Sequence, residues 1–142
     1  MDKTVQLREM LPSDAEAVSA LGIQSKASWG YGRAEMAVFA RELTLSGEDI
    51  PLLAAAEVAI VDGGTVGYFT IKSHPNGVDE LEHLFVRPDR FRQGIGTALL
   101  HAALRAAKAR GIELLTIIAD PNSTQFYVKH GAQIVGEHRS SI

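Results

Sequence analysis

The most informative segment of the sequence spans residues 84–100 and reads LFVRPDRFRQGIGTALL. An apolar segment and a basic loop lead here into Gly94-Ile95-Gly96, after which apolar residues recur at helical spacing. The first turn of a helix has unpaired N–H groups and a partial positive charge, and glycines let a ligand approach them. We therefore expect a pyrophosphate-binding turn with Arg90 and Arg92 at its rim. The alternative is a glycine-rich turn with solvated arginines.

Two better-known nucleotide motifs do not fit this turn. A Rossmann fingerprint needs a third glycine, and position 99 holds Leu99. A P-loop closes on Gly-Lys-Ser/Thr, whereas Gly96 is followed directly by Thr97. The turn is thus neither a dinucleotide fingerprint nor a P-loop.

The segments before the turn have the pattern of a strand meander. Residues 55–61, 65–71 and 79–86 are rich in β-formers, and turn signals at residues 62–64 and 75–77 separate them. Strands joined by such short turns are antiparallel neighbours. We therefore expect three consecutive antiparallel strands.

The segments after the turn alternate between helix and strand. We expect a helix over residues 94–110 that ends at Gly111, and then a strand over residues 112–119 that is buried on both faces. Asp120 and Pro121 have the pattern of an N-cap followed by proline at N1, which predicts a short helix up to residues 130–131. A last strand is expected over residues 133–138.

The N-terminal third predicts one strand and two helices. Residues 5–8 alternate like a strand, and Ser13 with Glu16 forms a capping-box pattern that predicts a helix from Asp14 to about Ser28. A second helix is expected over residues 33–45. The predicted fold class is α+β, a three-layer α/β/α arrangement in one domain over residues 1–142, with a strand–helix–strand crossover in a mixed sheet.

Composition excludes several classes of function. The net charge of -3 gives no field that would attract nucleic acid or an anionic membrane, and no apolar run is long enough to span a bilayer. The chain contains no cysteine, which excludes disulfides, thiolate metal sites and a cysteine nucleophile. We expect a cytoplasmic protein without a metal.

Two motifs together resemble those of the GNAT superfamily of N-acetyltransferases. The turn at Gly94 and Gly96 resembles its motif A, Q/R-x-x-G-x-G/A, and the run from Asn122 through Tyr127 to Gly131 resembles its motif B. Ser25-Lys26, Trp29-Gly30-Tyr31 and residues 80–86 are similar to one group of small bacterial members. The resemblance covers nearly the whole chain, and implies a mixed, mostly antiparallel sheet and acetyl-CoA as co-substrate.

The chain departs from the family pattern in several places. Phe91 stands at the Q/R position of motif A, where Arg92 or Gln93 could substitute. Asn122 lies five residues before Tyr127, whereas seven is usual and falls at Asp120; Ala132 replaces an aromatic residue. Few residues follow Gly131, so we expect either that the last strand is missing or that a partner chain completes the sheet in a homodimer.

The resemblance assigns the acetyl-CoA site to the two motifs and the strand before them. The N–H groups of residues 84–86 would hold the thioester carbonyl and the pantetheine arm, and Asn122 and Ser123 would contact that arm. The full set of expected cofactor residues is Leu84, Phe85, Val86, Arg90, Phe91, Arg92, Gln93, Gly94, Ile95, Gly96, Thr97, Asn122, Ser123 and Phe126.

The resemblance also suggests the catalytic groups. Glu80 and Glu82 alternate along one strand and share a face, where the family often places its general base; Glu80 is the first candidate and Glu82 the second. The alternative is a solvated strand face. His83 is expected on the other face, packed in the core. Tyr127 matches the general acid for the CoA thiolate, although a helical tyrosine is often only packing.

The implied function is transfer of an acetyl group to a primary amine of a small molecule. Because there is no cysteine, direct transfer in a ternary complex is expected. Trp29 and Tyr31 are expected to line the acceptor pocket, or else to anchor the helix pair. Two alternatives stay open: acetylation of a protein N-terminus or lysine, and a non-catalytic acetyl-CoA binding module.

Overall fold

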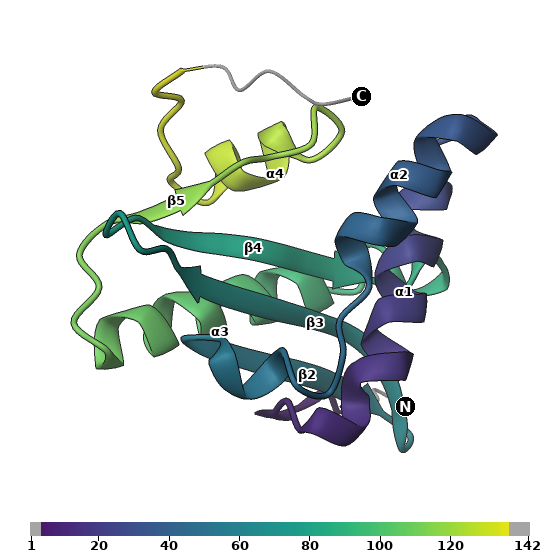
Figure 1. Ribbon diagram of the computed structural model, residues 1–142, viewed down its shortest axis with the longest axis horizontal. Coiled ribbons are helices and arrows are strands. Elements are labelled where there is room, and N and C mark those ends of the chain that lie inside the picture. The colour runs from purple at the N-terminus through teal and green to yellow at the C-terminus, as the bar shows by residue number, and fades with distance from the viewer. Residues whose placement is uncertain (1–3, 137–142) are drawn as a thin grey trace.

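The computed structural model describes residues 4–136, which form a five-stranded sheet with helices on both faces (Figure 1). The strands run in the order β1-β2-β3-β4-β5, and only β4 and β5 pair in parallel. The strands are β1 (Gln6–Glu9), β2 (Ala55–Val61), β3 (Gly64–Ser73), β4 (Asp79–Val86) and β5 (Leu115–Ile117). The helices are α1 (Ala15–Ala27), α2 (Arg33–Leu43), α3 (Ile95–Ala109) and α4 (Thr124–Lys129), with short 3-10 turns at Pro12–Asp14, Ile50–Leu52 and Pro88–Arg90.

Two tight turns fix the antiparallel meander of β2, β3 and β4. Asp62 and Gly63 both have positive φ, 50° and 78°, as a two-residue hairpin turn that matches strand twist requires. The second turn is closed by a hydrogen bond from the N–H of His74 to the carbonyl of Val78, with Gly77 at φ 87°. The predicted antiparallel strands are confirmed.

Helices cover the two faces of this sheet, and each face has its own apolar cluster. On one face α3 packs Leu99 and Ala103 against Phe69 of β3, and all three side chains are fully buried. On the other face α1 packs Val18 against Tyr68, and α2 lies beside α1 (Figure 1). The predicted three-layer α+β architecture is confirmed, as is the crossover from β4 through α3 to β5.

The sheet divides after the first three residues of β4. Asp79–Leu81 pair with Leu115–Ile117 of β5, and from there to Val86 the strand pairs only with β3 among the described residues. The N–H of Arg87 bonds to the carbonyl of Val66. Since bonding to one neighbour alternates along an antiparallel strand, the N–H groups of Leu84 and Val86 point to the open side.

A β-bulge at Glu82 changes which side chains share a face. Leu81 lies opposite Ile71, and His83 lies opposite Thr70, so Glu82 is an extra residue between the two pairs. His83 therefore points to the α1 side of the sheet, as do Glu80 and Glu82. The expectation that His83 faces away from the two glutamates is wrong, because a bulge interrupts the alternation on which it depended.

Several predicted boundaries and caps are corrected. Asp14, not Ser13, closes the turn before α1: its carboxylate accepts the N–H of Leu11, and the helix begins at Ala15. The last short helix begins at Thr124 rather than Pro121, because Asp120 starts a turn in which its carbonyl accepts the N–H of Ser123.

The C-terminal strands also differ from expectation. β5 is only Leu115–Ile117 and is half-buried, because it is an edge strand in the described structure rather than a buried central one. Of the strand expected over residues 133–138, residues 133–136 are not in a strand and the rest lie outside the described residues. The expected homodimer stays a prediction. Across residues 4–136, no helix combines the length and apolar character that crossing a bilayer requires.

Gly67 lies where β3 packs against α3 and leaves no space for a side chain. A Cβ at this position would lie 2.8 Å from Leu99 Cδ1 and 2.9 Å from the carbonyl oxygen of Phe85. We expect Gly67→Ala to lower the free energy of unfolding by about 1–3 kcal/mol through overpacking. Denaturant unfolding measures this loss. Gly64→Ala in the same strand is the control, since its Cβ would meet nothing closer than 3.7 Å; equal losses would contradict the packing argument.

Candidate active site

A cavity of about 530 Å³ opens where β4 separates from β5. Four parts of the chain form its walls: the end of α1, the end of β4, the turn into α3, and the segment from the β5–α4 loop through α4. The lining residues are Ser25, Lys26, Trp29, Leu84, Phe85, Val86, Arg90, Phe91, Arg92, Gly94, Gly96, Thr97, Asp120, Asn122, Ser123, Phe126, Tyr127, Lys129 and His130.

One end of the cavity is the turn into α3. Arg92 and Gly94 both have positive φ, 63° and 80°, which turns the chain sharply into the helix. The first intrahelical bond runs from the N–H of Ala98 to the carbonyl of Gly94, so the N–H groups of Ile95, Gly96 and Thr97 have no partner within the helix. With the two lining arginines nearby, these donors suit a pyrophosphate.

The open edge of β4 forms the adjoining wall. Leu84 and Val86 line the cavity and direct their N–H groups toward it. An extended ligand carrying amide groups could bond there as an additional strand would. The edge begins at the α3 turn and leads toward the point where β4 and β5 separate.

A histidine ties α4 to α3 beside this turn. His130 Nδ1 lies 2.8 Å from the carbonyl oxygen of Phe126, so it must be the protonated nitrogen. Nε2 lies 3.2 Å from the hydroxyl oxygen of Thr97. The imidazole thus links the end of α4 to the first turn of α3 beside the cavity.

Tyr127 is the buried hydroxyl-bearing side chain of α4. It is 8% exposed and lines the cavity, and its ring packs edge-on against Phe126. Burial raises the pKa of Tyr127 to about 12. The phenol is therefore protonated at neutral pH and is available as a hydrogen-bond and proton donor.

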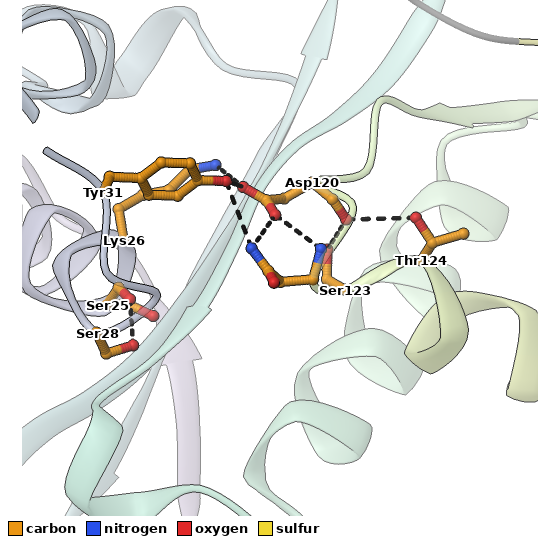
Figure 2. A network of polar contacts seen from close by, with 8 residues as sticks. Ser25, Lys26, Ser28, Tyr31, Asp120, Ser123 and Thr124 are labelled. Carbon is orange, nitrogen blue, oxygen red and sulfur yellow. Dashed lines mark hydrogen bonds and ion pairs between the residues drawn. The ribbon is translucent and has the colours of Figure 1, made fainter. Parts of the chain in front are cut away.

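A polar cluster around Asp120 closes the cavity on the side of α1 and α2 (Figure 2). Its Oδ2 accepts Lys26 Nζ at 2.5 Å and the hydroxyl of Tyr31 at 2.6 Å. Its Oδ1 accepts the N–H and the side-chain amide of Asn122, both at 2.8 Å. The carbonyl of Asp120 accepts the hydroxyls of Ser123 and Thr124. One residue thus organises the loop between β5 and α4.

The charge of Asp120 is stabilised against its burial. Desolvation raises the pKa, but the hydrogen bonds from Lys26 and Tyr31 outweigh it, and the pKa falls from 3.8 to about 2. Tyr31 shifts the other way: burial and the Asp120 carboxylate raise its pKa to about 12. At neutral pH the Asp120 carboxylate is therefore ionised and the Tyr31 phenol is neutral.

Most of the predicted cofactor residues come together in this cavity. Gln93 and Ile95 do not line it, and Ile95 is in the core, because its side chain points from the first turn of α3 toward the sheet. The lining residues that sequence reasoning did not assign to the site are Ser25, Lys26, Asp120, Lys129 and His130. The sequence held a signal for three of them. Asp120 lies at the usual motif B spacing of seven residues before Tyr127, and Ser25-Lys26 is similar to a pair in small bacterial members of the family.

The two glutamates lie on β4 outside the cavity lining. Glu80 Oε1 is 2.7 Å from His74 Nε2, which ties this carboxylate to a neighbour. Glu82 Oε2 is 4.0 Å from Lys72 Nζ, and its Oε1 is 3.6 Å from His83 Nδ1. Burial raises the pKa of Glu82. His83 is buried, and desolvation lowers its pKa to about 4, which leaves it neutral.

The two aromatic residues expected at the acceptor pocket have different positions. Trp29 lines the cavity and stacks on Phe91 with the ring centroids 6.0 Å apart, so it bridges the end of α1 and the turn before α3. Tyr31 packs edge-on against Phe39 of α2 and bonds to Asp120. Tyr31 thus anchors the helix pair and also supports the cavity wall.

Comparison with known proteins identifies the family. Residues 54–131 match the model of the acetyltransferase (GNAT) domain. A streptothricin acetyltransferase A from Bacillus subtilis is 34% identical over 79 residues, which are 54% of this chain and 46% of that protein. The chain thus spans about half the length of this relative, and it belongs to the GNAT acetyltransferase family.

Solved structures share the fold at low sequence identity. A GCN5-related N-acetyltransferase from Ralstonia eutropha superposes with a TM-score of 0.78 at 20% identity, covering 98% of this chain and 99% of the other. PaiA N-acetyltransferase from Thermoplasma acidophilum, in complex with coenzyme A, gives 0.75 at 22% identity, covering 90% and 89%.

The pKa of Asp120 predicts a specific loss of stability in acid. Because the folded-state pKa lies below the ordinary value, the carboxylate contributes stability above pH 3.8 that is lost as pH falls toward 2. We expect Asp120→Asn to unfold more easily than the wild type at pH 6 and to lose less of its remaining stability between pH 5 and pH 2. Thermal unfolding across that pH range measures both; parallel curves would contradict the prediction.

Proposed function

We propose that the protein transfers the acetyl group of acetyl-CoA to a primary amine of a small molecule, by direct attack in a ternary complex. The observation that carries this proposal is one continuous cavity that joins the N–H groups at the start of α3 to the open edge of β4. The first suits a pyrophosphate and the second suits the amide groups of a pantetheine arm. The coenzyme A complex of the Thermoplasma protein and the name of the Bacillus relative support the cofactor and the acceptor class.

In this proposal the start of α3 and the open edge of β4 divide the binding of acetyl-CoA. The N–H groups of Gly96 and Thr97, with Arg90 and Arg92, would bind the phosphates. The N–H groups of Leu84 and Val86 would orient the arm and the thioester carbonyl. Backbone donors suit this task because they are fixed before the ligand arrives and need no reorganisation as charge develops on the carbonyl oxygen.

The chemical step needs a base for the amine and an acid for the thiolate. The amine nitrogen attacks the thioester carbon, the C–N bond forms, and the C–S bond breaks as the electron pair leaves with sulfur. The proton lost by the amine would pass through water to Glu82, and the phenol of Tyr127 would protonate the thiolate. Glu82 is favoured over Glu80 because it lies at the bulge beside the opening of the sheet, whereas Glu80 is tied to His74.

Binding of the co-substrate tests the proposal first. Calorimetric titration is expected to give micromolar affinity for acetyl-CoA, similar affinity for CoA, and no binding of NADH. An acceptor screen by thiol release then separates the alternatives. Turnover of small amines supports the proposal, whereas acetyl-CoA binding without any turnover would indicate a binding module. Absence of acetyl-CoA binding would overturn the assignment of the cavity.

The acid role of Tyr127 has a matched control. We expect Tyr127→Phe to lower kcat by about 100-fold, because the thiolate would leave without a proton donor, while acetyl-CoA affinity changes little. Tyr68→Phe is the control: its hydroxyl is buried and has no hydrogen-bond partner among residues 4–136, so its loss should leave turnover unchanged. Steady-state kinetics with the best amine measure both, and an unchanged kcat in Tyr127→Phe removes this residue from the mechanism.

The base is tested by comparing the two glutamates of β4. We expect Glu82→Gln to lower kcat by about 100-fold and Glu80→Gln to have a clearly smaller effect. Since a base must be deprotonated, activity should rise as the pH increases through the raised pKa of Glu82. This rise should be missing from the pH profile of Glu82→Gln. A pH profile for each variant measures it. The reverse order of effects would assign the base to Glu80.

A further inference from the structure

The ion pair between Lys26 and Asp120 connects α1 to the β5–α4 loop across the opening between β4 and β5, and it forms one boundary of the cavity. Lys26 lies in the last turn of α1. Asp120 lies three residues after Ile117, the residue of β5 that pairs with Leu81 of β4. Lys26 is also near enough to His83 to contribute to lowering the pKa of that imidazole. The pair therefore lies beside the part of β4 just before Leu84.

In the proposed complex, the acyl group of acyl-CoA would end beside this ion pair. From the phosphate-binding turn, a ligand following the edge of β4 passes Val86 and then Leu84, about 7 Å further along the strand. The next groups in that direction are the bulge at Glu82 and the wall made by Lys26 and Asp120. Lys26 and Asp120 line the cavity, whereas Glu82 does not. An acyl chain longer than acetyl would be directed toward this wall.

The Lys26–Asp120 ion pair forms a rigid part of the cavity wall. The side chains of Lys26 and Asp120 are only 13% and 12% exposed, so separating them would leave two poorly solvated charges. Lys26 Nζ also lies 4.4 Å from the ring centroid of Phe39, and Tyr31 bonds to the same carboxylate oxygen of Asp120. Figure 2 shows Lys26 of α1 and Tyr31 meeting Asp120 of the β5–α4 loop, and Phe39 adds the contact from α2.

The carboxylate itself is saturated and has no role left in binding an acceptor. Oδ2 accepts two hydrogen bonds and Oδ1 accepts two more. Asp120 is thus unsuited to recognise an incoming ammonium group, and its charge serves the link to Lys26. This distinguishes a structural wall from an acceptor-binding carboxylate.

We propose that the Lys26–Asp120 pair is a specificity-determining element that restricts the acyl donor to short chains by fixing the width of the cavity at its acyl end. The inference rests on the proposed use of acyl-CoA. The pair acts by position: it carries no proton in the reaction and makes no bond to the reacting atoms.

The test compares acetyl-CoA with butyryl-CoA as probes. For each variant, calorimetry gives the two dissociation constants, and kinetics with one accepted amine gives the two kcat/KM values. We expect the wild type to prefer acetyl-CoA and Lys26→Ala to reduce this preference by about tenfold, the scale on which a pocket discriminates one or two methylenes. Lys26→Arg, which keeps the ion pair, should retain the preference.

A second substitution of Lys26 keeps the test valid if Lys26→Ala does not fold. Lys26→Met keeps most of the side-chain volume beside Phe39 while removing the charge, and we expect it to melt cooperatively and to show the same relaxed preference. Lys108→Ala, at an exposed position of α3, is the control for loss of a helical lysine. An unchanged preference in a folded Lys26→Met or Lys26→Ala overturns the inference while leaving the proposed function intact. A wild type that binds neither acyl-CoA overturns both.

Discussion

The separation of β4 from β5 after Leu81 is the constraint on which the rest of the site depends. A strand inside a sheet has its N–H and carbonyl groups bonded on both sides, so it cannot bind a ligand by its backbone. Within residues 4–136, β5 pairs with only three residues of β4, and the remaining length of β4 offers donors on one side. The crossover helix α3 begins beside the end of the same strand, which places its unpaired N–H groups next to the open edge. One topological feature thus supplies both halves of the proposed acetyl-CoA site.

An opened sheet needs something else to hold its two halves together. Here polar links on both sides of the cavity add to the apolar packing of Phe126 and Tyr127 against the core. Thr97 and His130 join α3 to α4, and Lys26 and Tyr31 join the α1–α2 layer to Asp120. Polar links suit this position because their geometry is directional, whereas apolar packing would tend to fill the space. The cost of burying Asp120 is offset by four hydrogen bonds, two of which also order its own loop.

The bulge at Glu82 has a comparable local effect on β4. It places Glu82 and His83 on the same side of the sheet, where burial raises the pKa of the first and lowers that of the second. A carboxylate with a raised pKa is a stronger base than an exposed one, which is the property that the proposed proton transfer requires. Without the extra residue, regular alternation would direct His83 to the α3 side.

Local pattern was sufficient to predict the fold class, the antiparallel meander, the long crossover helix and the glycine turn, because each depends on strand alternation, turn residues or helical spacing. Residues 55–61 and 79–86 were predicted with the observed bounds for the same reason. The tertiary structure alone decided the bulge at Glu82, the three-residue length of β5 and the role of Asp120. A bulge depends on the partner strand, and the length of β5 on where pairing stops. The ion pair joins residues 94 positions apart, which no local pattern records.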